Sequence, residues 1–134
     1  PPPPPLAPSV AYLARRRGPP AVDDAAALGP ALADPNYSLS LVAAVSQFKV
    51  AQVVEALDAA GKEKEDETWN NLQVELISCA RTYVWHNVLK EFKESIQKAP
   101  VSLQGVLGRL WAVAALGALE EDAAALAAAA LLSP

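Results

Sequence analysis

Apolar residues recur at helical spacing through long stretches of this chain. Between residues 35 and 60, two sets keep the i, i+3, i+4, i+7 spacing of an amphipathic helix. They are Leu41, Ala44, Val45 and Phe48, followed by Val50, Val53, Val54 and Leu57. The second set is half a turn out of phase with the first, so we expect this helix to be covered on two sides. Asp34 before Pro35 predicts the start of the helix, and Gly61 predicts its end.

A second helix is predicted from Glu67 to about Lys98, with Asp66 as its N-cap. It carries two apolar rows on different faces. The first row is Trp69, Leu72, Leu76, Cys79 and Tyr83, and the second is Val74, Ile77, Val84, Val88 and Phe92. Arg81 falls in the middle of the second row. Either its stem packs while its charge reaches water, or it pairs with a carboxylate from another helix.

A third helix is predicted after Pro100, with Ser102 as its N-cap. Its apolar row is Leu103, Val106, Leu107, Leu110, Val113 and Ala114. A parallel row of small residues, Gly105, Gly108, Ala112 and Ala115, predicts close approach by another helix. The alanine-rich segment from Asp122 either continues this helix or forms a short separate one.

The fold class predicted from these patterns is all-α, a partial bundle of three long helices over residues 35–134. Residues 1–34 are rich in proline and alanine, so we expect an extended arm or linker with a possible helical turn near Asp23–Leu28. That arm is either a stiff connector or a ligand for an aromatic-lined groove. The chain begins within a proline run and ends at "LLSP", which suggests a piece of a longer protein.

Charge and hydropathy argue against two classes of partner. The net charge is −4, and the one basic cluster, Arg15-Arg16-Arg17, is expected to be a solvated loop, so nucleic-acid binding is not expected. The longest uninterrupted apolar runs fall short of the ~20 residues of a membrane-spanning helix. No targeting signal is recognisable.

Residues able to carry chemistry are few, and they do not form a recognisable site. Cys79 and His86 are the chain's only cysteine and only histidine, but seven helical residues separate them by about 10.5 Å. That distance excludes a thiolate–imidazole pair or a shared metal ion. We interpret Cys79 as a core residue, His86 as solvated, and Glu120-Glu121-Asp122 as a solvated helix end. The predicted site residues are therefore none: no catalytic, no cofactor-binding and no metal-ligating group.

The segment from Glu67 to Asp122 nevertheless resembles the C-terminal helical domain of peroxisomal acyl-CoA oxidases. The likeness lies in Trp69-Asn70, the Val74-Glu75-Leu76 step, Val88-Leu89 with Phe92, and Leu103, Leu107, Leu110 and Leu116 of the next helix. Val10-Ala11-Tyr12-Leu13 is similar to a segment that follows the flavin domain in that family. Two features differ: Arg81-Thr82 stands where the family often has Ala-His, and alanine-rich sequence around Ala123–Leu126 replaces a Gly-Asp-Phe segment.

The resemblance implies a parent enzyme that uses FAD and oxygen to convert an acyl-CoA to a trans-2-enoyl-CoA and hydrogen peroxide, in peroxisomal fatty-acid β-oxidation. It also implies that the flavin domains and the catalytic glutamate precede this piece of the chain. The partners would be the rest of the oxidase chain, the acyl-CoA substrate and a second subunit in a homodimer. The alternative is a free-standing helical interaction module whose proline-rich arm recruits a partner.

Overall fold

The structure is a computed structural model, which describes residues 31–132 of the chain and side chains as far as Ala129. Its elements are α3 (Pro35–Ala60), the 3-10 helix η2 (Lys62–Lys64), α4 (Glu65–Asn71), α5 (Gln73–Lys98), α6 (Val101–Glu121) and α7 (Ala123–Leu132). No strand occurs in this described region. The predicted all-α class and its three long helices, now α3, α5 and α6, are confirmed.

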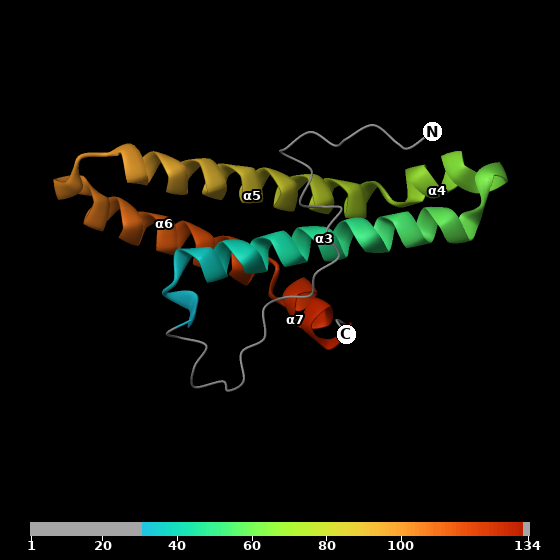
Figure 1. Ribbon diagram of the computed structural model, residues 1–134. Coiled ribbons are helices and arrows are strands. Elements are labelled where there is room, and N and C mark those ends of the chain that lie inside the picture. Colours follow the sequence, from blue (N-terminus) through green and yellow to red (C-terminus); the bar gives the residue numbers. More distant parts are fainter. Residues whose placement is uncertain (1–30, 133–134) are drawn as a thin grey trace, which may run out of the picture.

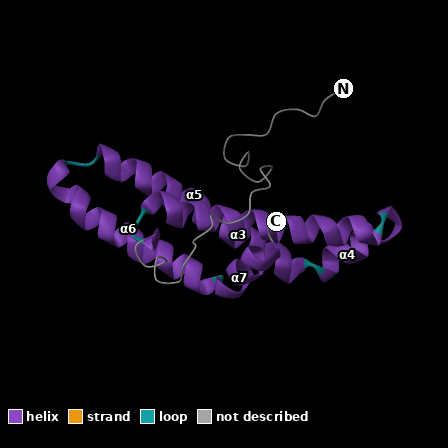
Figure 2. Ribbon diagram, turned by 60° about the horizontal axis from the view of Figure 1, so that its bottom comes forward, coloured by secondary structure: helices purple, strands orange, loops and turns teal. Residues whose placement is uncertain are grey.

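The three long helices pack along one another (Figure 1). Helix α5 runs beside α3 in the opposite direction, and α6 turns back alongside α5 and also contacts α3. The short α7 packs against α3, and the second view shows it lying near the middle of the molecule (Figure 2). The result is a partial bundle in which α3 contacts every other helix of residues 31–132.

The ends of α3 are those predicted from sequence. Asp34 caps the helix by accepting a 2.9 Å hydrogen bond from the Asn36 backbone N–H, and Pro35 occupies the first turn. Gly61 ends the helix with a φ of 73°, a backbone conformation that favours glycine. Of the predicted arm, residues 1–30 lie outside the described region, which includes the Asp23–Leu28 turn and Arg15-Arg16-Arg17. Ala31 and Leu32 are helical, and Leu32 O accepts a 3.0 Å bond from Ser38 Oγ.

The predicted second helix is two helices, α4 and α5, separated at Leu72, where φ is −96° and ψ is 13°. Helix α4 begins at Glu65, before the predicted cap Asp66, because three acidic residues in its first turn complement the helix dipole. Helix α6 begins at Val101, with Pro100 rather than Ser102 at the N-cap. The alanine-rich segment after Asp122 is a separate helix, α7.

The core lies where α3, α5 and α6 meet. Its main buried cluster consists of Leu41 and Val42 from α3, Leu89 from α5, and Trp111, Ala115, Ala118 and Leu119 from α6. The indole N–H of Trp111 donates a 2.8 Å hydrogen bond to Leu89 O inside this cluster. This bond satisfies the ring's polar atom and fixes α6 against α5.

Two of the apolar rows found in the sequence are mostly exposed in the described fold. On α6, Leu103, Val106, Leu110 and Val113 are exposed, and the buried face is the one that carries Trp111. On α5, Val74, Ile77, Val84 and Val88 are exposed, although Phe92 packs against the core. Both helices have more apolar faces than the described neighbours cover, so periodicity alone could not identify the buried one. On α3 the outcome is mixed, because Leu41, Ala44, Val45 and Val53 are buried while Val54 is exposed.

The small-residue row of α6 does not bring another described helix into close contact. A methyl group built onto Gly105 or Gly108 meets no atom within 4 Å among the described residues. Ala115 is fully buried, so the row faces the core only at that end. The prediction of close approach along the whole row is wrong for the described residues.

Two of the long helices, α3 and α6, meet the length and composition of a membrane-spanning helix. Core helices of globular proteins meet the same test, and α3 is the central helix here. The absence of a membrane span therefore stays a prediction from sequence.

Truncating Trp111 should test the central packing. Trp111→Phe keeps an aromatic ring but removes the hydrogen bond to Leu89 O, so we expect a loss of about 1 kcal/mol in the free energy of unfolding. Trp111→Ala also empties the ring site and should cost about 3–5 kcal/mol. Urea denaturation followed by circular dichroism measures both losses, and equal losses would contradict a packing role for the ring.

The open space at Gly108 predicts a stabilising substitution. Alanine is the better helix former, so Gly108→Ala should raise the free energy of unfolding of this chain by up to about 1 kcal/mol. Thermal unfolding of the two proteins at one concentration compares them. A lowered melting temperature would mean that another helix approaches Gly108 more closely than the structure shows.

Candidate functional site

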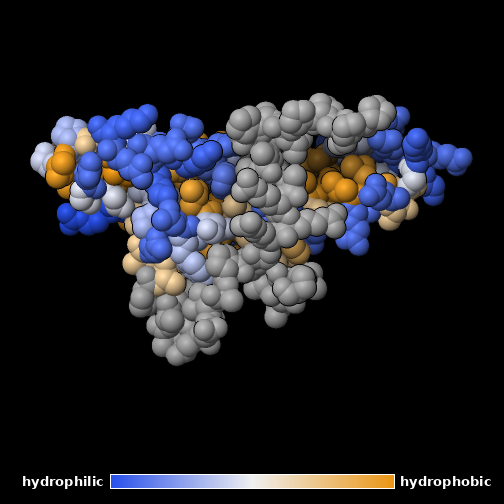
Figure 3. Space-filling model, in the orientation of Figure 1, coloured by the Kyte–Doolittle hydropathy of each residue, from blue (hydrophilic) through white to orange (hydrophobic). Residues whose placement is uncertain are grey.

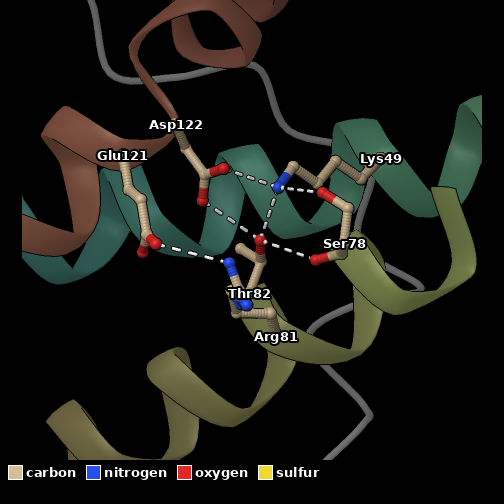
Figure 4. Close-up of polar contacts among 6 residues, drawn as sticks. All are labelled: Lys49, Ser78, Arg81, Thr82, Glu121 and Asp122. Atoms are coloured by element: carbon tan, nitrogen blue, oxygen red, sulfur yellow. Dashed lines mark hydrogen bonds and ion pairs between the residues drawn. The ribbon is translucent and has the colours of Figure 1, made fainter. Parts of the chain in front are cut away.

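The densest polar cluster of the described region centres on the side chain of Lys49 (Figure 4). Its ammonium group lies 2.8 Å from Ser78 Oγ, 2.7 Å from Thr82 Oγ1 and 2.6 Å from Asp122 Oδ1. The Thr82 hydroxyl is also 3.1 Å from Asp122 Oδ2 and from Ser78 O. Helices α3 and α5 and the α6–α7 junction thus each contribute a polar group.

This cluster is built to hold helices together rather than to react. An ammonium group has three N–H donors, and all three of Lys49 are used by protein acceptors. The Lys49 side chain is 11% exposed and that of Asp122 is 24% exposed, so the pair is largely removed from water. A lysine that acts as a base or nucleophile needs a free nitrogen, and this one has none to offer.

The prediction of a solvated acidic helix end is wrong for Asp122, whereas Glu120 and Glu121 are exposed as predicted. Asp122 binds Lys49 as described, and Glu121 Oε1 lies 3.4 Å from Arg81 Nη1. The second pair is exposed, so its contribution to stability is small. Arg81 therefore follows the second of its two predicted alternatives, a carboxylate partner on another helix. The described residues include no group of His, Cys, Asp and Glu arranged to hold a metal ion.

A hollow of about 490 Å³ lies beside the Lys49 cluster, between α3, α5 and the start of α7. Its walls include Lys49, Gln52, Leu72, Glu75 and Cys79. Cys79 is partly buried rather than part of the main core. Burial raises the pKa of its thiol, with the Lys49 charge opposing this effect and Glu75 adding to it. The thiol is therefore neutral at pH 7, as expected for a structural cysteine rather than a nucleophile.

The prediction that His86 is solvated is wrong. Its residue surface is only 7% exposed, because position 86 shares the inner face of α5 with Thr82 and Leu89. Burial, and then the nearby charge of Lys90, lower the pKa of its imidazole to about 4. His86 is thus a neutral interior side chain at physiological pH.

Sequence reasoning missed the Lys49 cluster. Lys49 was one charged residue in an apolar helix, and its acceptors lie 29, 33 and 73 positions further along the chain. The available signal was a lysine between two buried apolar sets on α3, a position that requires a polar partner. Periodicity cannot say which distant residue supplies that partner.

Removing one member of the Lys49–Asp122 pair should be costly. Asp122→Ala leaves the ammonium group without its counter-charge, and we expect a loss of about 3 kcal/mol in the free energy of unfolding. The double variant Lys49→Met/Asp122→Leu should recover much of that loss, since no buried charge remains. Glu121→Ala is the matched control, because its exposed pair should contribute less than about 1 kcal/mol. Equal losses for Asp122→Ala and Glu121→Ala in urea denaturation would contradict the assignment.

The lowered pKa of His86 predicts acid sensitivity. The unfolded chain binds a proton near pH 6.5, whereas the folded imidazole binds one only near pH 4. Stability should therefore fall as the pH drops, by about 1–2 kcal/mol between pH 6.5 and 5. The chain has one histidine, so His86→Leu should remove this part of the dependence. An imidazole that titrates near 6.5 in a proton NMR titration of the folded chain would contradict the burial.

The chain is similar to known proteins in its sequence profile and in its fold. The sequence profile described as acyl-CoA oxidase matches residues 34–134. The fold is similar to that in the crystal structure of acyl-CoA oxidase 1 from Yarrowia lipolytica, with a TM-score of 0.77 at 18% sequence identity. The similarity covers 96% of this chain and 19% of that one, so the chain spans about a fifth of the length of that oxidase. A search among curated proteins finds no match. Because the family profile extends over most of its length, the chain belongs to the acyl-CoA oxidase family.

Proposed function

We propose that this chain is the C-terminal helical domain of a flavin-dependent acyl-CoA oxidase, with a packing role and no catalytic residue of its own. The parent enzyme would convert an acyl-CoA and oxygen to a trans-2-enoyl-CoA and hydrogen peroxide in fatty-acid β-oxidation. The observation that carries the proposal is the family match over residues 34–134. The shared fold with about a fifth of a solved oxidase supports the role of a part rather than of a whole enzyme.

The polar groups of the described region agree with a packing role. The pocket beside α3 holds one ammonium group, Lys49, and its three N–H bonds already point to protein oxygens. A dinucleotide pyrophosphate requires free N–H donors or unpaired cations, so this pocket does not fit FAD. In the proposed enzyme the flavin, which supplies the redox chemistry, is bound mainly outside this chain.

Family membership also supports two finer assignments. One is a homodimer that the helical domain helps to shape, and the other is a peroxisomal location. Neither depends on a particular residue of the described region. The alternative of a free-standing interaction module rests on the proline-rich arm, of which residues 1–30 lie outside the described region.

The proposal predicts different behaviour for this chain and for the oxidase chain that contains it. Titration of the 134-residue protein with FAD should give no saturable change in the flavin spectrum. The longer chain should bind FAD stoichiometrically and release hydrogen peroxide when an acyl-CoA is added. Stoichiometric FAD binding by the 134-residue protein, or a longer chain that forms no peroxide from any acyl-CoA, would contradict the proposal.

A further inference from the structure

An exposed apolar row runs along α5. Val74, Ile77, Val84 and Val88 are spaced three to seven residues apart and so lie on one side of the helix. Arg81 occupies the same row, midway between Ile77 and Val84. Ile77 is 65% exposed, although isoleucine is among the residues most often buried in folded proteins.

A second exposed row runs along α6. Leu103, Val106, Leu110 and Val113 are three or four residues apart, and the row reaches Glu121 through Gly117. Val113 is 70% exposed. The buried face of the same helix, with Trp111 and Ala115, points into the core.

The two rows lie side by side. Arg81 belongs to the α5 row and Glu121 to the α6 row, and their side chains meet at 3.4 Å (Figure 4). Helices α5 and α6 are neighbours along their lengths, so the rows continue together from this ion pair toward the α5–α6 turn. Lys93 of α5 reaches Asn36 of α3 from a different face of the helix, which places the rows on the side away from α3. We call the eight aliphatic residues of the two rows the α5–α6 apolar face.

Apolar side chains are also visible on the front of the molecule, as orange areas between hydrophilic ones (Figure 3). Eight exposed aliphatic residues in two rows on neighbouring helices are unusual for a free surface and mark a place where another surface packs. Arg81 and Glu121, the two charged residues in the same rows as the α5–α6 apolar face, neutralise each other. Its partner is therefore expected to be aliphatic and uncharged.

We propose that the α5–α6 apolar face is the surface on which the remaining part of the oxidase chain packs. This inference rests on the proposed function. The solved oxidase with the same fold has about four-fifths of its length outside the matched region, so an oxidase offers a large surface in the same chain. Permanent interfaces resemble a domain core cut in half, and a face without net charge is of that kind.

The other occupants have less support. Helices that lie on membranes carry lysine and arginine along their polar side, whereas this chain has a net charge of −4. A second copy would have to supply the same aliphatic face, whereas the remaining oxidase chain is present at every α5–α6 apolar face by covalent linkage. The test below nevertheless distinguishes these occupants from the remaining oxidase chain.

Cysteine labelling tests the proposal. In a Cys79→Ser background, the reporters are Val88→Cys on α5 and Leu110→Cys on α6, and Glu94→Cys is the control. Position 94 is exposed and lies about 120° around α5 from position 88. The reaction rate with a maleimide is measured in the 134-residue chain and in the longer oxidase chain.

We expect both reporters to react rapidly in the 134-residue chain and at least about tenfold more slowly in the longer chain, because a covered thiol is inaccessible to the reagent. The control should react at the same rate in both. Equal reporter rates in a longer chain that binds FAD and forms peroxide would overturn the proposed surface and leave the proposed function standing. A longer chain without peroxide formation would overturn the function, and the surface proposal with it.

Two further outcomes would also overturn the proposal. Protection of the reporters that increases with protein concentration, in either chain, would identify a second copy as the occupant. Protection that requires vesicles of phosphatidylcholine and phosphatidylserine, in either chain, would identify a lipid surface.

Discussion

The arrangement of the helices depends most on the hydrogen bonds and the ion pair of the Lys49 ammonium group. Lys49 extends from an otherwise apolar part of α3, and its side chain is largely buried. A buried charge is tolerated only with a counter-charge and satisfied hydrogen bonds. Asp122 supplies the counter-charge from the end of α6, and Ser78 and Thr82 supply the other acceptors from α5. The same three bonds therefore fix α5 beside α3, and fix the point where the chain turns into α7. They also leave the nitrogen without reactive capacity, so the strongest polar cluster of the described region is structural.

The apolar core is complementary to this polar anchor. Trp111 fills the space between α5 and α6 and bonds Leu89 O, while Ala115 allows α6 to lie close to its neighbours. Together the polar and apolar contacts define one buried side for each helix. The other apolar sides of α5 and α6 have no neighbour among the described residues. These uncovered apolar side chains are the main physical support for the proposal that the chain is part of a larger assembly.

Much of the fold could be predicted from the sequence because local signals determine it. Asp34, Pro35 and Gly61 set the ends of α3, and periodic apolar residues identified the three long helices. The choice of buried face could not be predicted, because α6 is apolar on nearly every side and the pattern does not say which sides are covered. His86 was misplaced for a similar reason, since its neighbours Lys90 and Lys93 suggested a polar face although its own direction is inward. The Lys49–Asp122 pair spans 73 positions, and no local pattern reports a contact at that separation.

In the proposed enzyme this chain is one domain, and its α5–α6 apolar face is an internal surface. An experimental structure of the longer oxidase chain tests it most directly, through the exposed fractions of Ile77 and Val113. These residues are 65% and 70% exposed here. Both are expected to be buried there against residues of the same oxidase chain, with the Lys49–Asp122 pair unchanged. Both residues remaining open to solvent in that structure would contradict it.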